Sequence, residues 1–260
     1  MKTSNHLLRR LTAALLAAVL ALSIALPVFA SDDGDTIYIN SVSDLLSLAR
    51  NCAYDQWSVG KTVILQKDLS LEGMLWEPIP SFSGQFKGNG HTISDLTITG
   101  QYSPAGLFGI VEEQGSIESL SVRGVVSVSD SADTTTGGIV GINHGTLISC
   151  QFTGVVTGDS EVGGIVGRNE SEGTIDHSTA RAIVTGKSST GGIAGYNLGA
   201  ITGCTNVGSI NTEYPEASLD TDGFTAKMVD YINNKMAAAD DDATNSVTNV
   251  ATDTGGIAGR

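Results

Sequence analysis

The sequence is poor in basic residues and in aromatic side chains. Its 260 residues include 14 lysines and arginines against 28 acidic residues, and aromatic residues make up 5%. Three bases and no acid lie within residues 1–30, so the rest of the chain carries 11 bases against 28 acids, a formal charge of −17. Nucleic acid and anionic lipid both bind to basic surfaces. The composition therefore excludes both classes of partner.

A long apolar run is also missing, except at the start of the chain. Residues 1–10 hold the three bases and precede an uncharged run from Leu11 to Leu26. Small residues stand at Val28 and Ala30. This pattern is typical of a secretory signal peptide cleaved after Ala30. The alternative is an uncleaved membrane anchor, because residues 11–30 are just long enough to span a bilayer. Pro27 favours cleavage, so we expect a secreted or cell-surface protein without a membrane span.

Cysteine is scarce as well. The three cysteines are Cys52, Cys150 and Cys204. An odd number without regular spacing is not a disulfide framework. The sequence therefore predicts free thiols.

Glycine, by contrast, is abundant, and it marks an internal repeat. Among the 32 glycines, an element that reads Gly-Gly-Ile-x-Gly in its later copies begins at positions 105, 137, 163, 191 and 255. The steps between the second residues of these copies are 32, 26, 28 and 64 residues. Five further positions recur from unit to unit, and the equivalent residues at each position form a column. They are Asn143, Asn169 and Asn197; Gly115, Gly145, Gly173 and Gly199; Ile117, Leu147, Ile175 and Ile201; Leu120, Cys150, Ser178 and Cys204; and Val126, Val156, Val184 and Ile210.

Each unit contains three short β-prone runs separated by Gly, Asn and Ser clusters. A unit this short cannot bury its apolar residues alone, but it can form one coil of an all-β parallel solenoid whose neighbours cover it. Equivalent residues would then stack about 4.8 Å apart. The predicted internal ladder is Leu107, Ile139, Ile165, Ile193 and Ile257.

Other columns of the repeat lead to more specific predictions. The Asn column is expected to bond along the stack, and a corner between Leu147 and Cys150 is expected to bury both residues. Cys150 and Cys204 would lie two coils apart, about 9.6 Å, which exceeds the usual limit of about 7 Å for a disulfide. Both should be free, buried thiols.

The units resemble the GLUG-motif repeats of bacterial cell-surface proteins, which read roughly Gly-Gly-Leu-Val-Gly-x-Asn-x-Gly-x-Ile-x-x-Cys/Ser. The resemblance covers about residues 105–210, with a further start at 255–259. It implies a right-handed parallel β-helix in a secreted, adhesin-like protein, and some such repeats precede an immunoglobulin A-cleaving metallopeptidase. Phe108 and Val111 depart from the motif and indicate a degenerate first coil.

The flanking segments complete the expected domain layout. After the signal peptide, residues 31–60 are expected to form a strand and a helix that caps the solenoid, with Ser41 near the helix start. Residues 61–104 are expected to form irregular first coils. Residues 105–260 hold the repeats, with a helical insertion at about 211–254. The chain breaks off after a fresh repeat element, so we expect a fragment of a longer protein.

Residues 221–239 carry the pattern behind the predicted insertion. Phe224, Met228, Tyr231, Ile232 and Lys235 would share one face of a helix. We expect this face to pack on the solenoid, and partner binding is the alternative.

The sequence offers only weak candidates for catalytic or ligand-binding residues. No metal-binding or nucleophile motif is present, and Gly186-Lys187-Ser188 lacks the first glycine of a phosphate-binding loop. We expect neither cofactor nor metal, and His91 is interpreted as a turn residue. The densest acidic set could serve a polysaccharide lyase or hydrolase, and its members Asp159 and Glu161 could bind calcium, but solvated loop acids are the simpler interpretation. The set is Asp159, Glu161, Glu170, Glu172 and Asp176.

The first functional hypothesis is a non-catalytic, monomeric stalk or adhesion surface with a host or cell-wall glycan or protein as partner. The alternatives are a carbohydrate-active β-helix enzyme and the N-terminal part of a larger surface peptidase.

Overall fold

The computed structural model describes residues 35–54, 56–128, 134–211, 254–255 and 257–258. The predicted signal peptide lies outside these ranges. So do residues 212–253, which make up nearly all of the predicted helical insertion.

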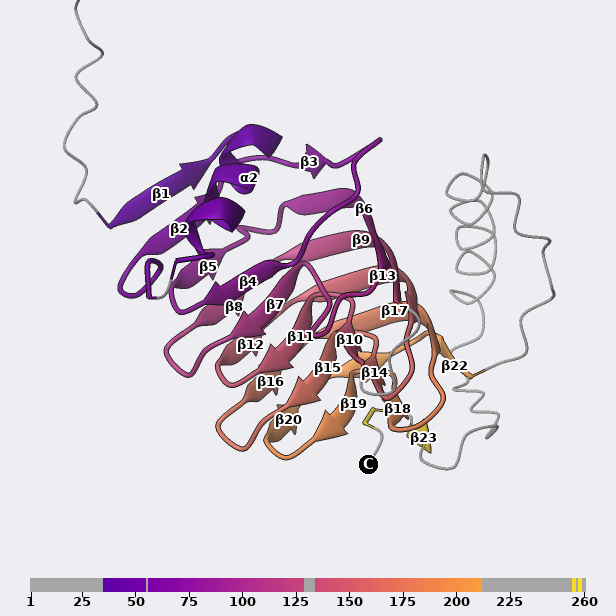
Figure 1. Ribbon diagram of the computed structural model, residues 1–260. Coiled ribbons are helices and arrows are strands. Elements are labelled where there is room, and N and C mark those ends of the chain that lie inside the picture. The colour runs from indigo at the N-terminus through magenta and orange to yellow at the C-terminus, as the bar shows by residue number, and fades with distance from the viewer. Residues whose placement is uncertain (1–34, 55, 129–133, 212–253, 256, 259–260) are drawn as a thin grey trace, which may run out of the picture. The chain divides into compact units, whose positions relative to one another are not determined.

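Four parallel sheets, named A to D here, form the described structure (Figure 1). Sheet A contains β1 (Thr36–Ile39), β2 (Thr62–Leu65), β5 (Gln85–Lys87), β8 (Ser116–Glu118), β12 (Thr146–Ile148), β16 (Thr174–Asp176) and β20 (Ala200–Thr202). Sheet B contains β3 (Leu69–Ser70), β6 (Thr92–Gly100), β9 (Ser121–Val128), β13 (Gln151–Thr157), β17 (Thr179–Thr185), β21 (Thr205–Asn206) and β22 (Ser209–Ile210). Sheet C contains β4 (Ile79–Phe82), β7 (Phe108–Val111), β11 (Val140–Asn143), β15 (Val166–Asn169) and β19 (Ala194–Asn197). Sheet D contains β10 (Thr135–Gly137), β14 (Glu161–Gly163), β18 (Thr190–Gly191) and β23 (Thr254–Gly255).

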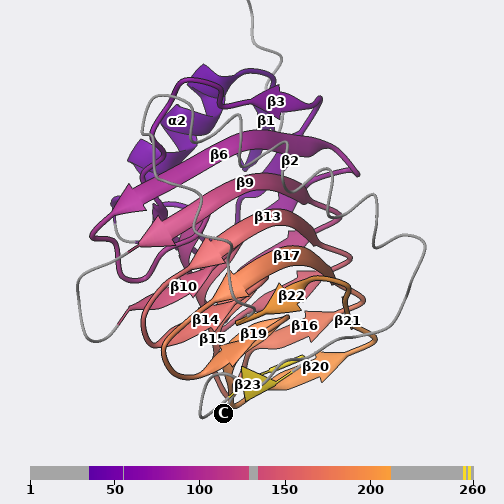
Figure 2. The same cartoon turned by 90° about the vertical axis from the view of Figure 1, so that its right-hand side faces the viewer.

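The chain passes through sheets C, A, B and D in turn, and the next pass stacks on the previous one (Figures 1 and 2). The seven stacked strands of sheet A mark about six turns. The predicted parallel β-helix is confirmed. The count of three strands per unit is wrong, because the residues before each Gly-Gly pair form the short fourth strand of sheet D.

The predicted aliphatic ladder forms the centre of the stack. Leu107, Ile139, Ile165 and Ile193 are fully buried. Their backbones also link the coils: Ile139 N donates to Ile165 O at 2.9 Å and Ile165 N donates to Ile193 O at 3.0 Å. Ile193 N donates in turn to Ile257 O at 2.7 Å, across the long fourth step of the repeat. Ile257, at the end of the ladder, is 38% exposed.

The asparagine column bonds along the stack as predicted. Asn143 Nδ2 donates to Asn169 Oδ1 at 2.7 Å, and Asn169 Nδ2 donates to Asn197 Oδ1 at 2.8 Å. Asn143 and Asn169 are fully buried, and Asn197 is half-buried. The amides satisfy one another inside the stack, which is the condition for burying polar groups without a large penalty.

A corner between sheets A and B buries both the Leu147 and the Cys150 columns, as predicted. It is made by one residue in each coil with left-handed backbone. Ser119, Ser149, His177 and Gly203 have φ values of 51°, 52°, 45° and 62°. This turn lets two inward-facing residues stand three positions apart without breaking the strand alternation.

Close backbone approach explains the glycines of the repeat. A Cβ atom on Gly163, at the end of β14, would lie 1.9 Å from Val166 O. In sheet B, a Cβ atom on Gly154 would lie 1.8 Å from Gly124 O, and the residue has φ of 152°. Residues with side chains do not fit at either place.

The first coils and the cap differ from the repeats in how they fill the interior. Phe82, Phe86 and Phe108 form a buried aromatic cluster with ring centroids 5.3–6.3 Å apart. Thus Phe108, the departure from the motif, packs against the early coils. The predicted capping helix is α2 (Val42–Asn51). Its N-cap Ser41 accepts a bond from Asp44 N at 3.2 Å, and Leu45 and Leu48 join the same core.

All three cysteines are free, as predicted. Cys52 and Cys150 are buried, and burial raises the pKa of their thiols to about 11 and about 12. Cys204 is half-buried rather than buried, because it lies in the last described rung of its column.

Substitution of Gly154 by alanine is expected to cost more than about 2 kcal/mol of unfolding free energy, since its Cβ would collide with the neighbouring coil. The matched control is Gly73→Ala. Gly73 also has positive φ, 75°, but nothing lies within 4 Å of its added Cβ, so the cost should be about 1 kcal/mol. Urea unfolding measures both. Equal losses would contradict the close approach.

Substitution of Asn169 by aspartate is expected to destabilise the fold by about 3 kcal/mol at pH 7, because it places a carboxylate in the buried amide column. Burial raises the pKa of such a carboxyl above its value of about 3.9 in the unfolded chain. The penalty is therefore present above that raised pKa and shrinks as the pH falls through it. Asn197→Asp, at a half-buried rung, is the milder control. Unfolding curves at pH 5 and pH 7 test the difference, and a pH-independent loss would contradict it.

Candidate functional site on the outer face of the repeats

The candidate site is centred on Arg168, on the outer face of sheet C. In the register of β11, β15 and β19, Arg168 lies between Ile142 and Tyr196. Its guanidinium is 5.4 Å from the centroid of the Tyr196 ring. Along β15, Val166, Gly167 and Asn169 are buried and Arg168 is the one residue of the strand that is not.

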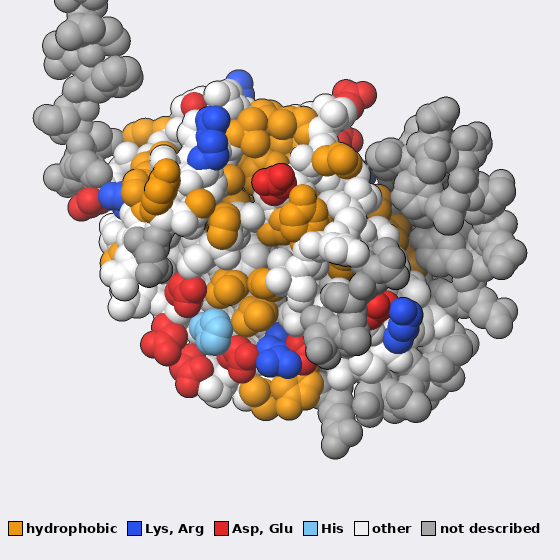
Figure 3. All heavy atoms as spheres, in the orientation of Figure 1, with side chains coloured by type: hydrophobic (Ala, Val, Ile, Leu, Met, Phe, Trp, Pro, Cys, Tyr) orange, Lys and Arg blue, Asp and Glu red, His pale blue; other side chains and the backbone are white. Residues whose placement is uncertain are grey.

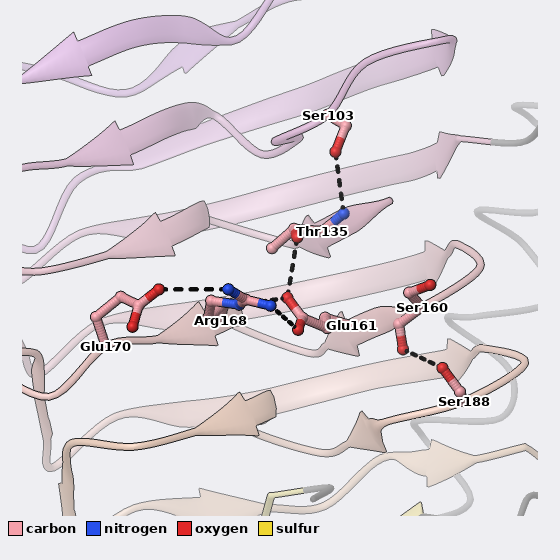
Figure 4. A network of polar contacts seen from close by, with 7 residues as sticks. All are labelled: Ser103, Thr135, Ser160, Glu161, Arg168, Glu170 and Ser188. Atoms are coloured by element: carbon pink, nitrogen blue, oxygen red, sulfur yellow. Dashed lines mark hydrogen bonds and ion pairs between the residues drawn. The ribbon is translucent and has the colours of Figure 1, made fainter. Parts of the chain in front are cut away.

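Arg168 holds two of the predicted acidic residues together (Figure 4). Its Nε donates to Glu161 Oε2 at 2.7 Å, and its Nη2 contacts the other oxygen of the same carboxylate. Its Nη1 lies 3.6 Å from Glu170 Oε1. Glu161 also accepts a bond from Thr135 Oγ1 at 3.0 Å, one coil away. The network thus joins sheets C and D and two successive coils.

The positive guanidinium of Arg168 lies between two carboxylates that are largely shielded from solvent. The side chains of Glu161 and Glu170 are 12% and 21% exposed, and that of Arg168 is 38% exposed. The hydrogen bond that Arg168 donates to Glu161 is the main cause that raises the pKa of Arg168. A bidentate arginine–carboxylate pair is a strong charge-assisted contact. Arg168 is therefore held in its charged form beside the two carboxylates.

The other three predicted residues lie apart from this pair. Asp159 Oδ1 is 2.7 Å from Lys187 Nζ, in the connections between sheets B and D. Asp176 Oδ1 is 2.9 Å from His177 Nδ1 at the corner between sheets A and B. Glu172 is in the loop between β15 and β16, where a hydrogen bond from Ser171 is the main cause that lowers its pKa, with a smaller contribution from His144. Acidic side chains gather around a histidine on the face seen in Figure 3.

The arrangement has limited chemical capacity. Glycoside hydrolysis needs two carboxylates with the sugar between them, whereas here an arginine lies between Glu161 and Glu170 and binds both. Within residues 35–54, 56–128, 134–211 and the short described pieces near 254–258, no group of three His, Cys, Asp or Glu side chains could hold a metal ion. The geometry supports a cross-coil link and a polar surface.

Sequence reasoning missed Arg168 and Tyr196 as the centre of the site. Both occupy the variable position between the last glycine of the element and the asparagine column. In the four units where the structure describes this position it is never buried, so aligning the repeats by column could have identified it.

Comparison with known proteins agrees with the repeat. Residues 158–185 match the model of the GLUG motif. The match covers β14, β15, β16 and β17, which make one complete coil and include Arg168, Glu161 and Glu170 but not Thr135 or Tyr196.

Two relatives share longer segments. The chain is 30% identical over 155 residues to halomucin of Haloquadratum walsbyi, which covers 55% of this chain and 2% of halomucin. It is 29% identical over 137 residues to a candidate Gly-rich membrane protein of Evansella cellulosilytica, covering 38% of this chain and 16% of that protein. The chain therefore spans only a small part of either relative.

Among solved structures, a candidate immunoglobulin A1 protease from Bacteroides ovatus aligns with a TM-score of 0.43 and 15% identity, over 70% of this chain and 79% of that one. Within the described residues, no helix combines the length and the apolar character needed to cross a bilayer.

Removing the arginine by Arg168→Met is expected to cost about 2–3 kcal/mol, because Glu161 loses its arginine partner in a largely buried place. The double variant Arg168→Met/Glu161→Gln should recover more than half of that loss. The control Lys61→Met leaves Asp35, whose side chain is 73% exposed, without its lysine and should cost less than about 1 kcal/mol. Urea unfolding of the four proteins measures these effects. Additive losses in the double variant would show that the pair is not coupled.

Proposed function

We propose that this chain is part of a secreted or cell-surface protein whose β-helix acts as a stalk and presents an outer face to a glycan, without catalysis by these residues. The GLUG motif and the two relatives support the more general part of this proposal, that the chain consists of repeats like those of surface proteins. A protein partner for the same face is the alternative.

The observation that carries the proposal is a polar column along the outer face of sheet A. Seven side chains stand in register, one in each strand of sheet A, and none of them is buried. They are Thr36, Thr62, Gln85, Ser116, Thr146, Thr174 and Ala200. Six of the seven can donate or accept hydrogen bonds, and they repeat at the strand spacing of about 4.8 Å.

A regular row of hydroxyl and amide groups suits a polymer with many hydroxyl groups. Individual hydrogen bonds to such a surface are weak, but a long ligand engages several at once. The net negative charge of the chain further favours a neutral glycan over an anionic one.

Binding to purified cell-wall and host glycans, immobilised on an array, tests the proposal with residues 31–260. The triple variant Thr62→Ala/Thr146→Ala/Thr174→Ala should weaken binding at least 10-fold, because it removes three hydroxyls from the column. A matched triple, Thr153→Ala/Thr157→Ala/Thr179→Ala, removes outward hydroxyls from sheet B and should leave binding unchanged. Equal effects of the two triples, or binding to protein probes alone, would contradict a glycan-binding face on sheet A.

The rival enzyme hypothesis has its own test. Glu161 and Glu170 are the one candidate carboxylate pair that shares a partner. Incubation with the bound glycans should release no reducing ends and no unsaturated products. Turnover that disappears in Glu161→Gln and Glu170→Gln would replace the binding proposal with a lyase or hydrolase.

A further inference from the structure

A second column of side chains lies on the outer face of sheet A, beside the polar column. Ile37 and Ile39 of β1 and Val63 and Leu65 of β2 pack in or against the core. Successive strand residues point to opposite faces, so the third residue of each strand points outward like the first. None of the seven third residues is buried. They are Tyr38, Ile64, Lys87, Glu118, Ile148, Asp176 and Thr202, in register from β1 to β20.

The first two members of this column are apolar. Tyr38 is 44% exposed, and within the described strands of sheet A it is the one large apolar side chain exposed to this extent. Its neighbour in register, Ile64, is half-buried. A single exposed apolar side chain is ordinary. Here two of them lie side by side, and each is two residues along its strand from a threonine of the polar column, Thr36 or Thr62.

Most later members of the second column carry charges. Lys87 and Glu118 are neighbours in register, and Ile148 lies between Glu118 and Asp176. A neutral ligand that covers a charge removes water from it, which costs free energy unless the ligand replaces the lost hydrogen bonds. Among the described strands of sheet A, β1 and β2 are the one adjacent pair without a charge in either outer column (Figure 1). A neutral group therefore fits best over these two strands.

The four outward side chains of β1 and β2 form a patch about as large as one sugar ring. Just before the two strands, Lys61 Nζ lies 4.0 Å from Asp35 Oδ1, so the charges at the edge of the patch offset each other. Thr36 and Tyr38 are two residues apart, about 7 Å, and the two strands are about 4.8 Å apart. One side of the patch thus carries two hydroxyls and the other side two apolar groups.

A hexopyranose ring has the same division of groups. Its axial C–H bonds make its faces apolar, and its hydroxyls form the rim. The face of an aromatic ring is negative and attracts such C–H bonds, while threonine hydroxyls can donate hydrogen bonds to sugar hydroxyls and accept them.

We infer that β1 and β2 hold an anchor subsite for one neutral hexopyranose ring of the glycan. Tyr38 and Ile64 pack against the apolar face of the ring, and Thr36 and Thr62 bond to hydroxyls on its rim. The rest of the glycan extends over the polar column toward β20. The inference rests on the proposed function, and it adds the place and the kind of ring by which the glycan is held.

Calorimetric titration of residues 31–260 with cellohexaose tests the subsite, because this glycan is linear and neutral and its rings are apolar on both faces. Tyr38→Thr and Ile64→Thr copy Thr202 of the same column, so they keep a β-prone residue in the strand and remove the apolar surface. Tyr38→Thr should weaken binding about 10-fold, and Ile64→Thr should weaken it less. Tyr38→Phe keeps the ring and should bind as tightly as the unchanged chain.

Matched controls remove the same groups at other places. Tyr54→Thr removes a tyrosine that is 73% exposed but lies in the connection between α2 and β2. Ile148→Thr removes the isoleucine that lies between two acids. Neither change should alter the affinity.

Saturation-transfer NMR gives a readout of the stacking itself. Irradiation of tyrosine ring protons should reach axial ring protons of the sugar in the unchanged chain and in Tyr54→Thr, but not in Tyr38→Thr. If Tyr38→Thr loses its fold, Tyr38→Leu removes the aromatic ring alone and should abolish the same transfer.

Equal affinities of Tyr38→Thr and Tyr54→Thr for cellohexaose would overturn the subsite and leave the proposed glycan-binding face standing. No binding of cellohexaose by the unchanged chain would also overturn the subsite. The glycan array then decides the proposed function separately: binding that depends on the threonines of sheet A keeps it, and binding to no glycan ends it as well.

Discussion

In-register hydrogen bonding between successive coils is the constraint on which the rest of the structure depends. Each strand pairs with the equivalent strand of the next coil, so equivalent residues stand above one another. A slip by one residue would turn every inward side chain outward. The aliphatic ladder, the asparagine column and the left-handed corners are all consequences of this register. So are the glycines, because stacked backbones leave no room for a Cβ at Gly154 and Gly163.

Much of this could be predicted because a repeat alignment is already a list of columns. The Ile139 ladder, the Asn169 column and the corner before Cys150 follow from spacing alone. The strands of sheet D could not be predicted in the same way, since Thr135–Gly137 and its equivalents are short and rich in glycine and threonine. The Arg168 contacts were also missed. They join residues in two sheets across a corner, and a repeat alignment does not measure distances across corners.

The acidic set shows the limit of inference from composition. Five acids close in sequence suggested one site, but the coil distributes them over two corners and a loop. Asp159 and Asp176 each have a basic partner of their own. Only Glu161 and Glu170 share a partner, and the arginine between them makes the pair a link between coils. The five acids therefore do not form a single site in the described structure.

The most direct test of the account is residue-resolved amide hydrogen exchange along the ladder. The amides of Ile139, Ile165 and Ile193 each donate to the next coil from a fully buried position. The account predicts that they exchange at least 1000-fold more slowly than the amides of Ser171 and Glu172 in the exposed loop, as expected for a cooperative core. Ladder amides that exchange as fast as this loop would contradict the in-register stack.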